Sequence, residues 1–101
     1  MDLSPALPIR LLIVDDDPQI RAMLAEYLAT FGMEAEGAEG GTAMRAAMSK
    51  QEYDLVILDL SLPGENGLTL CREIRESSNL PVIMLTARAE LADRVVGLEV
   101  G

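Results

Sequence analysis

The sequence predicts an α/β fold built on a parallel sheet. Short apolar runs that are typical of buried strands alternate with segments whose apolar residues recur at helical spacing. Two of these runs end directly in aspartate. Strands that alternate with helices form a parallel sheet through right-handed crossovers, which gives the α/β class. Because the chain has 101 residues, we expect one domain.

The first predicted strand and helix follow an irregular leader over residues 1–8, so the domain is expected over 9–101. Ile9–Val14 is the first predicted strand. Asp17 is a capping carboxylate in front of a proline, which begins a helix, and Gly32 ends that helix. The helix carries an apolar stripe of six residues: Ile20, Met23, Leu24, Tyr27, Leu28 and Phe31.

The middle of the chain predicts an edge strand, a helix and a buried strand. Met33–Ala38 alternates acidic with small or apolar residues, as a strand with one wet side does. Glycines 40–41 break the chain before a helix that carries the stripe Met44, Ala47 and Met48. Leu55–Leu58 is a continuous aliphatic run, which is typical of a strand buried on both faces.

The last part predicts a helix, a strand and a further helix. The turn-rich loop 62–67 leads into a helix marked by Leu68, Cys71 and Ile74. Val82–Leu85 is uninterrupted apolar and is typical of an interior strand. A fourth helix carries Leu91, Val95 and Leu98 on one face.

The composition excludes several classes of protein. A net charge of −9 argues against a nucleic-acid surface, which needs clustered Lys and Arg. The single cysteine, Cys71, rules out an internal disulfide and is expected to be a small buried hydrophobe, and without histidine no Cys/His metal motif is possible. No apolar stretch is long enough to span a bilayer, and no signal-peptide pattern is visible. We therefore expect a soluble cytoplasmic protein that binds no membrane.

Three carboxylates are predicted to meet at one edge of the sheet. Leu11–Val14 runs into Asp15 and Asp16, and Leu55–Leu58 runs into Asp59. Ligands of open parallel sheets bind outside the carboxyl ends of the strands, where these side chains would converge. Carboxylates packed this closely repel one another unless a cation holds them or they share protons. Mg²⁺ takes one or two carboxylates and keeps several waters, so we expect Asp16 as the better direct ligand and Asp15 acting partly through water.

Asp59 is the carboxylate that helix capping explains least, because the loop after it delays the next helix to about Gly67. A carboxylate beside a divalent cation can attack phosphorus, since the cation screens the repulsion between the anions. Asp59 is therefore the candidate nucleophile, with an aspartyl phosphate as the product. Thr86 follows the last apolar strand, and its hydroxyl can donate a hydrogen bond to a phosphoryl group at the same edge.

These motifs resemble the receiver domain of bacterial two-component response regulators. The stretches that carry the resemblance are Ile13–Asp17, Leu58–Gly64, Leu85–Arg88 and Asp93–Gly101. They look like the OmpR/PhoB-like branch, whose members carry a winged-helix DNA-binding domain after the receiver. The resemblance covers residues 11–101 and implies a flavodoxin-like (CheY-like), doubly wound parallel sheet with strand order 2-1-3-4. It also implies a signalling phosphoacceptor that switches a transcriptional output, with at most self-catalysed phosphotransfer and dephosphorylation as its chemistry.

The resemblance also implies roles for single residues. Asp59 would accept a phosphoryl group from the histidine of a sensor kinase. Asp16, the Asp59 carboxylate and the backbone carbonyl of Ser61 would hold Mg²⁺, with Asp15 behind them. Thr86 would move toward the phosphoryl group and report its presence.

Two further positions, Ser61 and Arg88, would tune how fast the phosphoryl group is lost. In the family, a fifth strand with a lysine that pairs with the phosphoryl group, and a fifth helix, would come after Gly101. We therefore expect a C-terminally truncated receiver domain, in which the only lysine, Lys50, is too far away to substitute.

There are three alternative functions. An aspartate-nucleophile phosphohydrolase would use Asp15 and Asp17 as its Asp-x-Asp pair, but it would leave Asp59 without a role. A dinucleotide-binding domain needs a Gly-x-Gly-x-x-Gly after the first strand, which is absent. A truncated receiver could act as a protein-interaction module without productive phosphorylation. Self-association is expected in either receiver case, through the outer edge of Val82–Leu85 or through the fourth helix.

Overall fold

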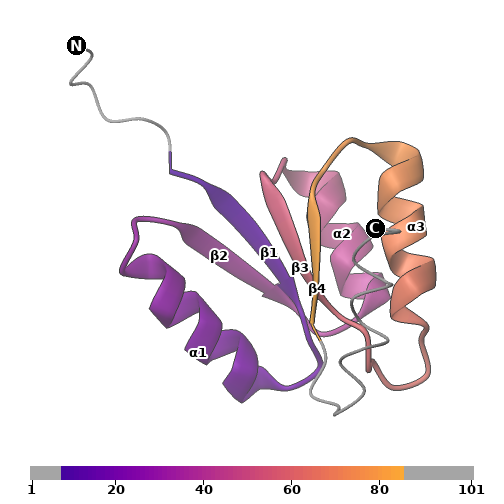
Figure 1. Cartoon of the computed structure of the whole chain (residues 1–101), viewed down its shortest axis with the longest axis horizontal. Coiled ribbons are helices and arrows are strands. Elements are labelled where there is room, and N and C mark those ends of the chain that lie inside the picture. Colours follow the sequence, from indigo (N-terminus) through magenta and orange to yellow (C-terminus); the bar gives the residue numbers. More distant parts are fainter. Residues whose placement is uncertain (1–7, 86–101) are drawn as a thin grey trace.

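The computed structural model describes residues 8–85, which form a four-stranded parallel sheet with helices on both sides (Figure 1). The strand order is β2-β1-β3-β4, so the predicted fold class and strand order are confirmed. Residues 1–7 of the predicted leader and the whole of the predicted fourth helix lie outside the described residues. The elements in chain order are β1 (Arg10–Val14), α1 (Pro18–Ala29), β2 (Glu34–Ala38), α2 (Gly41–Lys50), β3 (Leu55–Asp59), α3 (Gly67–Ser77) and β4 (Val82–Leu85).

The ends of α1 are where the local chemistry predicts them. The Asp17 carboxylate accepts a hydrogen bond from the Gln19 N–H at 2.9 Å, and Pro18 occupies the first helical position. Beyond the other end, Gly32 has a φ of +78°, which glycine adopts without the steric cost that other residues meet. Asp17 is thus the predicted cap.

The main core lies between the sheet and the helices α2 and α3. Side chains alternate along each strand, so every second residue faces these helices. Cys71 is one of the buried residues on this side, as predicted, and it is a free thiol. The buried cluster consists of Leu12, Val14, Ala38, Met44, Tyr53, Val56, Leu58, Leu62, Leu70, Cys71, Ile74, Val82 and Met84.

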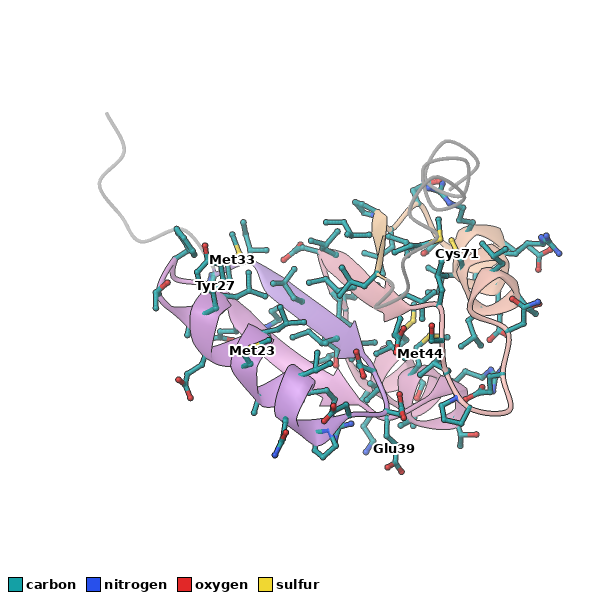
Figure 2. The ribbon with its side chains drawn as sticks, turned by 60° about the horizontal axis from the view of Figure 1, so that its bottom comes forward. Met23, Tyr27, Met33, Glu39, Met44 and Cys71 are labelled. Carbon is teal, nitrogen blue, oxygen red and sulfur yellow. The ribbon has the colours of Figure 1, made fainter. Side chains whose placement is uncertain are left out.

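The other side of the sheet is covered by α1 (Figure 1). Leu11 and Ile13 are almost fully buried there, whereas Ile83 of β4 is 43% exposed. The apolar stripe predicted for this helix, α1, is only partly buried. No α1 residue is fully buried. The more exposed residues of the predicted stripe are Met23, Tyr27 and Phe31, and Phe31 lies just beyond the end of α1. Met23 and Tyr27 lie along α1 in Figure 2, and the Tyr27 and Phe31 rings meet edge to face.

The described residues contain no helix that is both long and apolar enough to cross a membrane.

Candidate functional site

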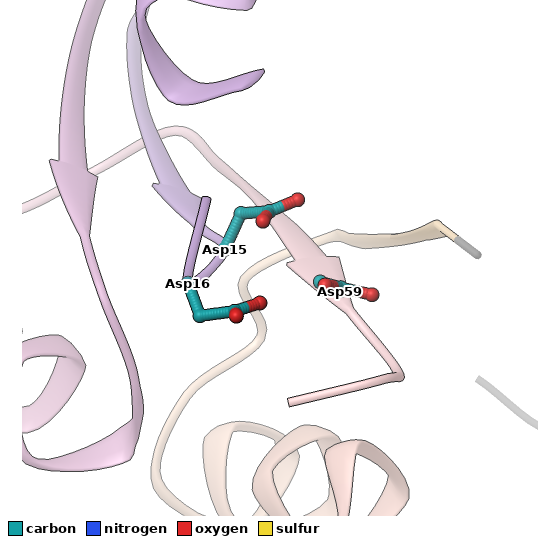
Figure 3. Close-up of side chains that lie close together, drawn as sticks. All are labelled: Asp15, Asp16 and Asp59. Carbon is teal, nitrogen blue, oxygen red and sulfur yellow. The ribbon is translucent and has the colours of Figure 1, made fainter. Parts of the chain in front are cut away.

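Three aspartates lie together where β1 and β3 end (Figure 3). The two strands are parallel neighbours, with Val14 opposite Leu58, so the residues that follow them share one edge of the sheet. Each of Asp15, Asp16 and Asp59 offers a carboxylate oxygen within 4.8 Å of the other two. The structure thus brings together the three carboxylates that the sequence pattern predicted to converge.

The three carboxylates differ in their surroundings. Asp15 is buried, and its Oδ1 accepts a hydrogen bond from the Asp17 N–H at 2.9 Å. Asp16 is exposed, and Asp59 is half-buried. One oxygen of Asp59 accepts a hydrogen bond from the Ser61 N–H at 2.8 Å. The cluster therefore combines one enclosed carboxylate with two that a ligand can reach.

The pKa of the Asp15 carboxyl group is raised by its position in the cluster. Burial is the largest cause that raises the pKa of its carboxyl group above the ordinary value. The hydrogen bond from the Asp17 N–H opposes this effect, while the negative charges of Asp59 and Asp16 add to it. The charged form of Asp15 is therefore less favourable in the folded protein than in water, and a positive charge in the cluster would favour it.

We expect Asp15→Asn to stabilise the metal-free domain at neutral pH. A raised folded-state pKa gives stability that is present below the unfolded-state pKa of about 3.9 and is lost as the pH rises through the folded-state value. The amide keeps an oxygen for the Asp17 N–H but carries no charge. Urea unfolding in the presence of a chelator should show the variant more stable by about 1 kcal/mol at pH 7, with the difference falling toward zero as the pH drops below about 4. An equal difference at both pH values would contradict the assignment.

Arg21 supports the cluster from α1, a role that was not predicted from the sequence. Its Nη1 donates to the backbone carbonyl of Asp15 at 2.6 Å. Gly37 makes room for this side chain, since a Cβ there would come within 2.8 Å of Arg21 Cδ. The contact joins residues from α1, β2 and the β1–α1 loop, so no local pattern signals it.

The loop after Asp59 separates its carboxylate from the start of the next helix, α3. Asn66 caps α3 by accepting a hydrogen bond from the Leu68 N–H at 2.9 Å. Gly67 begins α3 directly against the end of β3, where an added Cβ would lie 2.7 Å from Leu60 Cα and 3.0 Å from the Asp59 carbonyl oxygen. Helix capping therefore does not explain Asp59.

The donor set suits a small hard cation. Mg²⁺ prefers oxygen ligands such as carboxylates, and each of the three aspartates offers one oxygen within 4.8 Å of the other two. Asp17 does not join the three carboxylates, since its side chain caps α1, and an Asp-x-Asp pair is not formed.

A separate hollow of about 710 Å³ between the C-terminal ends of α2 and α3 is lined by none of these aspartates. Thr86 and Arg88 lie outside the described residues.

The comparisons with known proteins identify the family. A family model described as the response regulator receiver domain matches residues 11–101. The chain belongs to this family. The receiver domain is 46% identical over 94 residues to the transcriptional regulatory protein GltR of Pseudomonas aeruginosa, covering 90% of this chain and 39% of GltR. It is 40% identical to TorR of Escherichia coli, covering 94% of this chain and 41% of TorR. The chain thus spans about two fifths of the length of these relatives.

Solved structures agree with the family assignment. The receiver domain of TorR superposes with a TM-score of 0.82 at 40% identity, covering 93% of this chain and 78% of that one. The response regulator TrrA of Thermotoga maritima, solved in complex with Mg²⁺-BeF, gives a TM-score of 0.75 at 41% identity, covering 81% of this chain and 72% of TrrA. These matches confirm the family that the sequence motifs predicted. Receiver domains are signalling domains.

Proposed function

We propose that this receiver domain accepts a phosphoryl group on Asp59 from the phosphohistidine of a sensor kinase. An Asp59 carboxylate oxygen attacks phosphorus, an O–P bond forms, and the N–P bond breaks with its electron pair left on the imidazole. The product is an aspartyl phosphate. The observation that carries the proposal is the position of Asp59 within the acidic cluster, at a strand end where it caps no helix.

The proposed cofactor is Mg²⁺, held by Asp16, Asp59 and the backbone carbonyl of Ser61, with Asp15 acting partly through water. When bound, the cation screens the repulsion between the Asp59 carboxylate and the phosphoryl oxygens. The buried Asp15 contributes a charge that favours a cation in the cluster. The complex of the TrrA relative with Mg²⁺-BeF supports this choice of metal.

The output side of the proposal involves residues outside the described range. Thr86 would donate its hydroxyl to the phosphoryl group, and Ser61 and Arg88 would set how fast that group is lost. The relatives are named transcriptional regulatory proteins, so we propose a transcriptional output from a cytoplasmic protein. The receiver segment itself, with a net charge of −9, is not expected to bind nucleic acid directly.

The decisive experiment is phosphorylation with a small acyl-phosphate donor, followed by intact mass measurement. With Mg²⁺ we expect one phosphoryl group per chain, and with a chelator we expect almost none. A chain that stays unmodified in both conditions, while remaining folded, would instead be an interaction module without productive phosphorylation.

Asp16→Ala should remove measurable Mg²⁺ binding. Asp16 is the exposed member of the cluster, so its carboxylate is the one most accessible to a hydrated cation. Titration followed by the chemical shifts of the site amides should show saturation for the parent and no saturation for the variant in the same concentration range. An unchanged affinity would mean that the metal ligands are misassigned.

We also propose that the chain self-associates. Among residues 8–85, β4 pairs only with β3, and its Ile83 side chain is 43% exposed. An unpaired strand edge and an exposed apolar side chain on the face of a sheet both tend to recruit another chain. Light scattering at micromolar concentration should give a mass above that of the monomer, and Ile83→Lys should lower it. A monomer at every concentration tested would exclude this mode of assembly.

A further inference from the structure

Glu65 forms a long-range contact that none of the site roles above uses. Its two carboxylate oxygens both accept from the Gly41 N–H, at 2.9 and 3.1 Å. Glu65 belongs to the loop between β3 and α3, whereas Gly41 is the first residue of α2. The side chain therefore ties the loop that follows Asp59 to the start of a different helix.

The start of α2 needs this contact. Its cap residue, Gly40, has no side chain to accept from the first N–H groups of the helix, and the first turn contains no acidic residue. The Glu65 carboxylate supplies both an acceptor and a negative charge at the positive end of the helix. A Cβ on Gly40 would lie 2.7 Å from Glu65 Oε2, so the glycine leaves space for the carboxylate.

The contact links the β3–α3 loop, which follows Asp59, to the segment that follows β2. On one side, the Asp15 N–H donates to the Ala38 carbonyl at 3.0 Å, and the chain then runs through 39–40 to Gly41. On the other side, the loop from Asp59 to Glu65 contains a turn in which the Glu65 N–H donates to the backbone carbonyl of Leu62 at 3.3 Å. The Leu62 residue is buried. The Glu65 carboxylate joins the two halves.

We infer that Glu65 is a positioning residue for the metal and phosphoryl site. Strand pairing already fixes Asp59, because β3 lies between β1 and β4. The hydrogen bond between Glu65 and Gly41 restrains the loop that follows Asp59. In this way it fixes the backbone at Ser61, whose N–H donates to the Asp59 carboxylate. The inference rests on the proposed function, in which the Ser61 carbonyl is a ligand of Mg²⁺.

The test compares Mg²⁺ affinity in three variants. Glu65→Ala should weaken binding by about tenfold, the lower end of the usual loss when a group that supports a metal ligand is removed. Glu65→Gln keeps an oxygen for the Gly41 N–H and should restore most of the affinity. Glu39→Ala is the matched control, because it removes the same charge from the neighbouring loop at a side chain that points outward in Figure 2. Equal losses in Glu65→Ala and Glu39→Ala would reduce the effect to net charge and overturn the inference.

A second measurement keeps the inference separate from the proposed function. Amide hydrogen exchange without metal should become roughly five- to tenfold faster at Gly41 and at Ser61 in Glu65→Ala, but not in Glu39→Ala. Gly40→Ala, which displaces the carboxylate while leaving the charge, should behave like Glu65→Ala. If the parent binds no Mg²⁺, the proposed function fails while the exchange data still decide the role of Glu65. Unchanged exchange at Ser61 would refute the positioning role.

Discussion

Replacing Asp59 with asparagine should abolish the phosphoryl mass gain of the domain. The amide nitrogen carries no charge and the amide oxygen is a weak nucleophile, so no acyl phosphate forms at this position. The reaction with an acyl-phosphate donor and Mg²⁺, followed by intact mass measurement, gives the result directly. A variant that still gains one phosphoryl group would show that the acceptor lies elsewhere.

A matched control is available next to the same strand. Asp54 lies just before β3, at its opposite end, and its Oδ2 accepts from the Arg10 N–H at 2.8 Å. Asp54→Asn removes the same charge and keeps an oxygen for that hydrogen bond. We expect this control to be phosphorylated as fully as the parent.

Gly67→Ala should both destabilise the domain and impair phosphorylation. The added methyl group would meet backbone atoms of Leu60 and Asp59, which cannot rotate away as a side chain can. The start of α3 or the end of β3 must move, at a cost of about 1–3 kcal/mol for overpacking. Thermal unfolding should show a Tm lower by several degrees, and the yield of phosphorylated protein should fall in conditions where the variant remains folded.

Gly64→Ala separates this clash from backbone strain. Gly64 lies in the same loop with a φ of +69°, but no atom lies within 4 Å of the added Cβ. We expect a cost of about 1–2 kcal/mol from the left-handed conformation and a smaller effect on phosphorylation. If both variants lost phosphorylation equally, contact with the end of β3 would not be the cause.

The elements of this fold could be predicted because their signals are local. The run Leu55–Leu58, the cap at Asp17 and the stop at Gly32 each depend on a few neighbouring residues. The convergence of Asp15 and Asp59 was also predictable, since parallel strands bring their carboxyl ends to one edge of the sheet.

The supporting contacts could not be predicted in the same way. The pairs Arg21 with the Asp15 carbonyl and Glu65 with Gly41 join different elements, and they depend on how helices sit on the sheet. The partial exposure of the α1 stripe has the same origin. Periodicity shows which face of a helix is apolar, but not how much of that face the sheet can cover.

β1 comes before its two partner strands in the sequence, yet it lies between them in the sheet. It pairs with β2, which follows one helix later, and with β3, which follows two helices later. Parallel partners cannot meet through a hairpin turn, and non-local pairings of this kind slow folding. The carboxylates of Asp15 and Asp59 come together only when the β1–β3 pairing is complete. A cation that binds them therefore binds only the folded chain. Under the proposed function, raising its concentration increases the stability of the fold as well as the reactivity of Asp59.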